Sequence, residues 1–218
     1  ELAGLAPVEQ TLQETSAFAE AVIDAATRYA GARMALRHGA PAGADAGLVV
    51  LGMGKLGGGE LNFSSDVDLV FLFASGGETT GPAPVSYEEF YLRQGRLLIR
   101  LLDPVTEEGF VFRVDMRLRP FGDSGPLVAS FAFFEDYLQA HGRDWERYAW
   151  VKARAMSGGP RFGALYDEVV RPFVYRRYLD YGVFEGLRQL HRKVRDEAQR
   201  RAAGRPERAN DVKLSTKS

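Results

Sequence analysis

The sequence predicts an α+β fold in which a small mixed sheet with flanking helices is followed by a C-terminal helical extension. Short apolar runs at Leu48–Leu51 and Asp66–Phe73 have the length and composition of buried strands, whereas longer segments repeat apolar residues at helical spacing. The 218 residues, 45% of them hydrophobic, can bury a core. We expect an N-terminal helix and linker at 1–47, a core at 48–130 and a helical region at 131–218.

Two helices are predicted before and after these strands. Apolar residues recur at helical spacing from Val8 to about Arg37, and Gly39 follows as a stop signal. Ser86 with Glu89 three residues later forms a capping box, which opens a second helix that runs to about Leu102. Both helices are long enough to cover one face of a small sheet.

The last third of the chain is predicted to be helical. Two helices are expected at Phe131–Gln139 and Arg143–Ala155, and the remaining residues are expected to be helical until Gly204. Core packing is favoured for Trp145 over stacking on an adenine. A solvated helix face explains the basic stretch Arg188–Arg208 better than nucleic-acid binding does.

A third strand is predicted from Phe110 to Arg119, because apolar and charged residues alternate there. One face would carry Phe112, Val114, Met116 and Leu118, and the other Arg113, Asp115, Arg117 and Arg119. This strand therefore adds a lone acid surrounded by cations.

Asp66 and Asp68 are the first candidates for chemistry. In a strand, residues two apart point to the same side, so both carboxylates could share a cation while the apolar run after them anchors the strand. The plainer interpretation is that both are solvated strand-edge residues. Asp115 favours a site, because three carboxylates can hold two Mg²⁺ ions for an in-line displacement at phosphorus.

Phosphate ligands are available around these acids. Glycines allow backbone N–H groups to approach phosphate closely, hydroxyl and amide side chains donate to it, and arginines neutralise it. Lys55 could contact phosphate or lie on the surface. The candidates are Lys55, Gly57, Gly58, Asn62, Ser64, Ser65, Arg117 and Arg119.

A dinucleotide-binding turn is the main competing interpretation, because Gly52, Gly54 and Gly57 match the spacing G-x-G-x-x-G after a strand. That fold needs a crossover helix after the turn. Only residues 58–65 separate Gly57 from Asp66, which is too short for a crossover. The interpretation is therefore rejected.

Composition excludes several other classes. The formal charge of −1 gives no global attraction to nucleic acid or anionic membranes, and there is no cysteine for disulfides or thiolate chemistry. No apolar run approaches the roughly 20 residues that span a bilayer, and no signal peptide is evident, so we expect a cytoplasmic protein. The histidines His38, His141 and His191 show no metal or triad spacing.

The Gly-Gly turn, the Asp-x-Asp strand and the later lone acid resemble the nucleotidyltransferase superfamily. More closely, four segments are similar to the bifunctional glutamine synthetase adenylyltransferase/adenylyl-removing enzymes. These segments are LGMGKLGGGELNFSSDVDLVFLF, GFVFRVDMRLRPFGDSGPLV, GRDWERYAWVKAR and RPFVYRRYLD. The resemblance implies a small sheet of the polymerase-β-like palm type. Because the family continues beyond Leu214 into a Gly-Gly-Ile-Arg-Glu-type segment, it also implies a fragment of a larger chain.

The resemblance further implies which reaction to expect. Asn62–Ser65, Asp144–Tyr148 and Arg171–Phe173 look like the family's N-terminal, adenylyl-removing half, whereas the transferase half shows Gly-Tyr-Gly-Ser before its aspartates. That half transfers AMP from glutamine synthetase to phosphate and releases ADP, with Asp66, Asp68 and Asp115 expected to hold Mg²⁺.

Expected partners are glutamine synthetase, a PII signal protein, ADP or ATP, and phosphate. Three alternatives stay open at this point. They are ATP-dependent adenylylation, a non-catalytic docking module, and an RNA-modifying nucleotidyltransferase.

Overall fold

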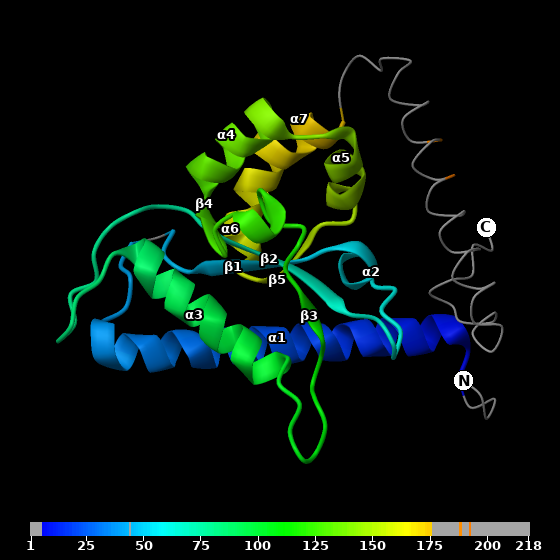
Figure 1. The fold of residues 1–218 in the computed structure, drawn as a ribbon, viewed down its shortest axis with the longest axis horizontal. Coiled ribbons are helices and arrows are strands. Elements are labelled where there is room, and N and C mark those ends of the chain that lie inside the picture. The colour runs from blue at the N-terminus through cyan, green and yellow to red at the C-terminus, as the bar shows by residue number, and fades with distance from the viewer. Residues whose placement is uncertain (1–5, 44, 176–187, 189–191, 193–218) are drawn as a thin grey trace.

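The computed structural model describes residues 6–43, 45–175, 188 and 192. These form three layers, with helices on both faces of a sheet (Figure 1). The strands are β1 Leu48–Gly52, β2 Val67–Phe73, β3 Val114–Asp115, β4 Val128–Ser130 and β5 Arg154–Ser157. The helices are α1 Val8–His38, α2 Gly54–Gly57, α3 Tyr87–Leu102, α4 Phe131–His141, α5 Asp144–Trp150, α6 Gly159–Leu165 and α7 Arg171–Val174. A 3₁₀ turn spans Gly122–Ser124, and a π-helical turn at Tyr166–Val170 joins α6 to α7.

The sheet is mixed, as predicted, and is built around β2. Its order is β3-β2-β1-β5, and β4 also pairs with β2. β1 runs antiparallel to β2 and to β5, whereas β3 and β4 both run parallel to β2. β3 pairs with the first two residues of β2 and β4 with the last three. The antiparallel β1–β2 pair confirms that no dinucleotide-type crossover follows β1.

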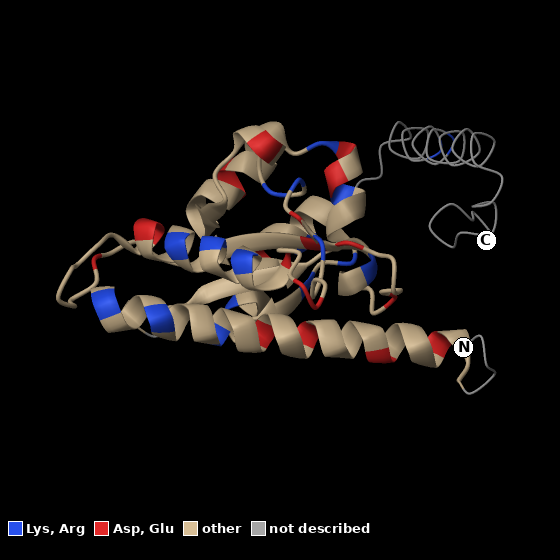
Figure 2. Cartoon of the chain, turned by 60° about the horizontal axis from the view of Figure 1, so that its bottom comes forward, with Lys and Arg blue, Asp and Glu red and all other residues tan. Residues whose placement is uncertain are grey.

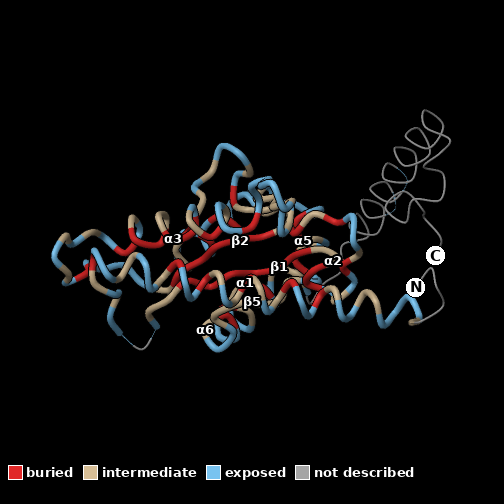
Figure 3. The backbone as a smooth tube through the Cα atoms, turned by 90° about the horizontal axis from the view of Figure 1, so that it is seen from below, coloured by how far each residue is buried: buried red, intermediate tan, exposed pale blue. Residues whose placement is uncertain are grey.

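Alternation along the strands divides the core into two clusters. Val67, Leu69 and Phe71 pack with α1 and α3, whereas Val70 and Leu72 pack with α4 and with the helices that follow it. The buried backbone accordingly runs through the sheet and the helix turns that face it (Figure 3). Since α1 contributes Ala19 and Ile23 to the first cluster, it belongs to the same packed body as the sheet.

The long helices form where the sequence predicts them. α1 ends at Gly39, which has φ of 75°, a backbone conformation that favours glycine. At the start of α3, the Ser86 hydroxyl accepts a hydrogen bond from Glu89 N at 3.2 Å, which confirms the Ser86 half of the predicted capping box. The Glu89 carboxylate binds Arg93 at 2.6 Å.

The predicted strand Phe110–Arg119 is wrong except for β3. Before β3, Phe112 N donates to Leu102 O, so this segment is held by the end of α3 and not by a strand. After Asp115 the chain turns, because Arg119 N donates to Met116 O and Gly122 N donates to Arg119 O. Apolar and charged residues alternate over the whole segment, so a strand was predicted throughout it. Outside β3, however, the backbone hydrogen bonds described here go to the end of α3 or lie within a turn.

Two strands were missed. The helix predicted at Arg143–Ala155 ends at Trp150, because Arg154 and Ala155 belong to β5 and pair with β1. β4 is only three residues long and follows a Gly-Pro break, so it has little periodic signal. The core prediction for Trp145 is also wrong, since its side chain is 42% exposed while Trp150 is 2% exposed.

Most of the predicted C-terminal helix, including the basic stretch Arg188–Arg208, lies outside the described residues. Of that stretch, Arg188 and Arg192 are described, and both are helical and exposed. Within the described part of the chain, no helix combines the length and apolar character that a bilayer span requires.

A matched pair of glycine variants tests the packing of α2 against Lys152, in the turn before β5. A Cβ on Gly57 would lie 2.0 Å from Lys152 O, a backbone atom, whereas the nearest atom to a Cβ on Gly58 would be in the flexible Lys152 side chain at 3.0 Å. We expect Gly57→Ala to lower the free energy of unfolding by about 1–3 kcal/mol or more, and Gly58→Ala by much less. Urea denaturation measures both, and equal losses would contradict this packing.

The buried pair of Tyr137 and Glu146 gives a second stability test. The Tyr137 hydroxyl donates to Glu146 Oε1 at 2.6 Å, and Glu146 Oε2 accepts from Arg143 N at 2.9 Å. Because Glu146 is 4% exposed, Tyr137→Phe leaves a buried acceptor and should cost about 1–3 kcal/mol. Tyr148→Phe, at a side chain 63% exposed, is the control.

The same pair predicts a pH dependence. Burial and the Glu146 carboxylate raise the pKa of Tyr137 from 10.0 to about 12. A raised pKa means that the stabilisation is complete below pH 10 and is lost as the pH rises toward 12. The stability difference between the wild type and Tyr137→Phe should shrink over this range, and a constant difference would argue against the bond.

Candidate functional site

The candidate site lies where β3 meets the beginning of β2. These strands pair in parallel, with Val67 opposite Val114 and Asp68 opposite Asp115. Residues that are paired across a sheet point to the same face, so the two aspartates share one side of it. That side is the face of Val70 and Leu72, which is covered by α4 and the helices after it. Two acids separated by 46 intervening residues are therefore neighbours.

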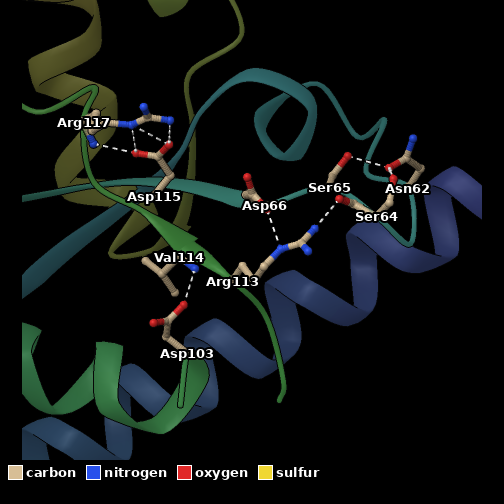
Figure 4. Close-up of polar contacts among 9 residues, drawn as sticks. All are labelled: Asn62, Ser64, Ser65, Asp66, Asp103, Arg113, Val114, Asp115 and Arg117. Carbon is tan, nitrogen blue, oxygen red and sulfur yellow. Dashed lines mark hydrogen bonds and ion pairs between the residues drawn. The ribbon is translucent and has the colours of Figure 1, made fainter. Parts of the chain in front are cut away.

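Asp66 lies just before β2 and is held by Arg113. Arg113 Nε donates to Asp66 Oδ1 at 2.7 Å, and its Nη2 donates to Ser64 O (Figure 4). The Arg113 carbonyl also accepts from Val67 N at 2.8 Å. Arg113, the residue before β3, therefore holds the loop before β2 close to β3. This contact positions the Asp66 carboxylate beside β3.

Asn62, Ser64 and Ser65 form a tight turn beside Asp66. Asn62 Oδ1 accepts from Ser65 Oγ at 2.6 Å and from Ser64 Oγ at 3.4 Å, and Ser65 N donates to Asn62 O (Figure 4). The side chain of Asn62 therefore organises the loop. The hydroxyls that sequence reasoning assigned to phosphate are used here in local contacts, as is common in turns.

Asp115 is paired with Arg117. Both Arg117 Nε and Arg117 N donate to Asp115 Oδ1, at 3.0 and 2.9 Å, and its Nη2 donates to Oδ2 (Figure 4). These hydrogen bonds lower the pKa of Asp115, so the carboxyl is ionised at neutral pH. The Arg117 side chain is 71% exposed, whereas that of Asp115 is 16% exposed. Asp115 also raises the pKa of Arg117, with a smaller contribution from Asp68.

Arg119 lies in the turn after β3 and not on a strand face. Its Nη1 donates to Met116 O at 2.8 Å, and its side chain is only 13% exposed. The same guanidinium lies 3.6 Å from Asp123. The charge of Arg119 helps to lower the pKa of Asp115, so it remains part of the local field although the predicted alternation is wrong.

The glycine segment lies beside Asp68. Gly54 has φ of 54°, and a Cβ there would be 3.1 Å from Asp68 Oδ2, so this glycine lets the carboxylate approach α2. Lys55 Nζ is buried, which excludes the surface interpretation of that residue. Gly57 is required by the close approach of Lys152 O described above.

Asp103 is a positioning residue that sequence reasoning missed. Its Oδ1 accepts from Val114 N at 2.8 Å and so ties β3 to the end of α3 (Figure 4). A carboxylate at a helix C-terminus is disfavoured by the helix dipole, so its occurrence at the C-cap of α3 was a usable signal for another role.

An aromatic groove of about 420 Å³ opens beside the Asn62–Ser65 turn. Phe63 is 82% exposed there, and Phe110 is 50% exposed. It is lined by Thr11, Glu14, Thr15, Phe18, Asn62, Phe63, Ser65, Phe110, Val111, Phe112 and Arg113. A groove with aromatic walls and a few polar groups can accept a planar ring beside Arg113, the partner of Asp66.

The donor set suits Mg²⁺, which prefers carboxylate oxygens. As arranged here, no cluster of three or more acidic, histidine or cysteine side chains within the described part of the chain has metal-binding geometry. The contacts give the reason, because Asp66 and Asp115 are turned toward Arg113 and Arg117. An ion held by all three acids would replace these arginine contacts.

A family model and individual relatives match most of this chain, and they agree on its family. The family model for glutamate-ammonia ligase adenylyltransferase matches residues 1–169. A bifunctional glutamine synthetase adenylyltransferase/adenylyl-removing enzyme of Thioalkalivibrio sulfidiphilus is 52% identical over 217 residues, which is 98% of this chain and 22% of the relative. An enzyme with the same name from Burkholderia mallei is 49% identical over 224 residues, 98% of this chain and 24% of the relative.

The chain spans less than a quarter of the length of these relatives. Nearly all of its own length is nevertheless covered by them. The chain therefore belongs to the glutamate-ammonia ligase adenylyltransferase family.

Proposed function

We propose that this chain carries the adenylyl-removing site of its family, built on a nucleotidyltransferase palm. The observation that carries the proposal is the parallel register that sets Asp68 opposite Asp115, with Asp66 two residues away. The names of the relatives include both addition and removal of an adenylyl group. The resemblance of Asn62–Ser65 and Arg171–Phe173 to the adenylyl-removing half favours removal.

The reaction is a phosphorolysis of the adenylylated tyrosine of glutamine synthetase. An oxygen of inorganic phosphate attacks the AMP phosphorus, and the bond from phosphorus to the tyrosine oxygen breaks. The tyrosine oxygen takes a proton, and the incoming phosphate becomes the β-phosphate of ADP. The attacking group and its target are both anionic, so the site must supply cations and fixed geometry.

Asp66, Asp68 and Asp115 would hold Mg²⁺. When bound, this ion supplies positive charge to the attacking and leaving oxygens. Asp115 is suited to the role because hydrogen bonds from Arg117 keep its pKa low. Arg113 keeps the loop before β2 against β3 through the Ser64 carbonyl, and that contact can persist while the Asp66 carboxylate turns.

The two following arginines have different proposed roles. Arg117 is exposed and held mainly by Asp115, so it can exchange that carboxylate for an incoming phosphate. Arg119 is fixed on backbone carbonyls and supplies a stationary positive charge. The AMP phosphate would be positioned by Gly57, Gly58, Ser64, Ser65, Asn62 and Lys55.

The aromatic groove supports a nucleotide or tyrosine substrate at this site. Phe63 and Phe110 offer exposed ring faces close to Asn62 and Ser65. Adenine and the tyrosine ring are both planar and can stack on such faces. Glutamine synthetase is the proposed protein partner, PII is a proposed regulator, and ATP-dependent adenylylation is the second candidate because the relatives are bifunctional.

Conservative variants of the acids test the site. With adenylylated glutamine synthetase, Mg²⁺ and phosphate, the chain should release ADP. Asp66→Asn or Asp68→Asn should reduce the rate more than about 100-fold, which exceeds the loss typical of changes to residues that only orient a metal ligand. Asp167→Asn, at an exposed position in the π-helical turn after α6, is the matched control. Full activity in both site variants would refute the assignment.

The same assay separates the alternatives. ATP consumption with unmodified synthetase would support adenylylation in place of removal. Binding of synthetase or PII without turnover, and without stabilisation by Mg²⁺, would support a docking module. Binding of RNA that weakens with salt would favour the RNA-modifying alternative.

Arg117→Gln tests how Asp115 is kept ionised. Because Arg117 is the main cause of the lowered pKa, its loss should raise the pKa of Asp115 and move the acid limb of the rate profile to higher pH. Loss of a phosphate ligand should also raise the phosphate concentration needed for half-maximal rate. Rates measured against pH and phosphate check both effects, with Arg171→Gln as control. Unchanged profiles would exclude Arg117 from both roles.

A further inference from the structure

A second pocket, of about 870 Å³, opens between the C-terminal half of α1 and the face of α3. It is lined by Arg33, Met34, Leu36, Arg37, His38, Pro82, Ala83, Arg93, Arg96 and Arg100. Figure 2 shows the basic segments of these two helices side by side, while the acidic segments of α1 lie in its other half. None of the lining residues belongs to the proposed catalytic site.

Connected hydrogen bonds hold two of the lining residues, His38 and Arg93, in position. His38 is 3% exposed, and its Nδ1 lies 2.6 Å from Ala83 O. Because a carbonyl can only accept, Nδ1 carries the proton, and Nε2 is free to accept from Arg93 Nη1 at 3.2 Å. Arg93 Nε also donates to Glu89 at 2.6 Å. The Arg93 guanidinium is therefore held in position before any ligand arrives.

The positive charge around this pocket is not balanced locally. Among the residues that the structure describes, Arg93 has an ion pair with Glu89, whereas Arg33, Arg37, Arg96 and Arg100 form no ion pair. The helix dipole explains cations in a last turn, which applies to Arg37 and Arg100. It does not explain Arg33 and Arg96.

The positive charge of this pocket also contrasts with the net charge of the whole chain. The formal net charge is −1, so the five arginines are not a sample of a generally basic surface. Like charges that converge on one concave space repel one another and are stabilised when an anion enters. Guanidinium groups bind phosphate through paired hydrogen bonds, which a single lysine cannot supply.

We propose that this pocket binds the polyphosphate group of a compact anion. Its volume lies in the range of small-molecule sites, and it is concave, whereas a nucleic-acid surface would be an extended basic stripe. Arg33 and Arg37 come from α1, and Arg93, Arg96 and Arg100 come from one face of α3, so several phosphates can be contacted at once. Met34, Leu36 and Pro82 offer an apolar wall for a nucleoside.

Binding of inorganic triphosphate and of ATP to the full chain, measured by calorimetry in EDTA, tests the proposal. EDTA removes Mg²⁺ and so suppresses binding that depends on the three aspartates. Arg96→Gln with Arg100→Gln should weaken the binding of both probes about tenfold or more, because each charge-assisted contact carries substantial free energy. Arg28→Gln with Arg171→Gln removes the same charge outside the pocket and should leave the affinity nearly unchanged.

Comparing the two probes shows which part of the ligand the pocket recognises. Equal affinity for both probes would assign recognition to the polyphosphate group alone, and tighter binding of ATP would add a contribution from the nucleoside. The proposal fails if neither probe binds, if the two double variants lose affinity equally, or if an oligoglutamate peptide binds as tightly as triphosphate. Because the assay contains no synthetase and no Mg²⁺, its failure would leave the proposed phosphorolysis untouched.

Discussion

The candidate site depends on a two-residue parallel pairing between β2 and β3. This short ladder alone sets Asp68 opposite Asp115, and a two-residue strand makes too few hydrogen bonds to be stable by itself. Side chains supply the rest, since Asp103 accepts from Val114 N and Arg113 binds Asp66 and Ser64. The end of α3 and the loop before β2 thus hold β3 from two sides.

The electrostatics of the site follow from this arrangement. Carboxylates that converge on one place repel one another, and arginines from the β3 segment offset that repulsion. Arg113 and Arg117 are therefore counterions in this structure. Under the proposed function, a metal held by the acids would release Arg117 for the incoming phosphate. Arg119 is proposed to remain in the turn in either state, because its partners include the Met116 carbonyl and Asp123, neither of which is a candidate metal ligand.

Sequence reasoning found the long elements and proposed three acids, of which the structure sets Asp68 opposite Asp115. It did not find how β3 is held. Local signals were sufficient for α1, for the Ser86 cap and for β2, because periodicity and capping are properties of neighbouring residues. β5 depends on pairing with β1 about a hundred residues away, and no local pattern records that contact. The alternation at residues 110–119 misled, because the bonds of Phe112 and Val114 go to the end of α3.

We propose that Asp66, Asp68 and Asp115 form one metal site. A crystal structure with Mn²⁺, which binds the same oxygen ligands as Mg²⁺, tests it through the anomalous signal of the metal. We expect a peak in contact with the carboxylates of Asp66, Asp68 and Asp115, with the Arg113–Asp66 and Arg117–Asp115 contacts broken. A peak at other residues, or both arginine pairs intact at saturating Mn²⁺, would contradict it.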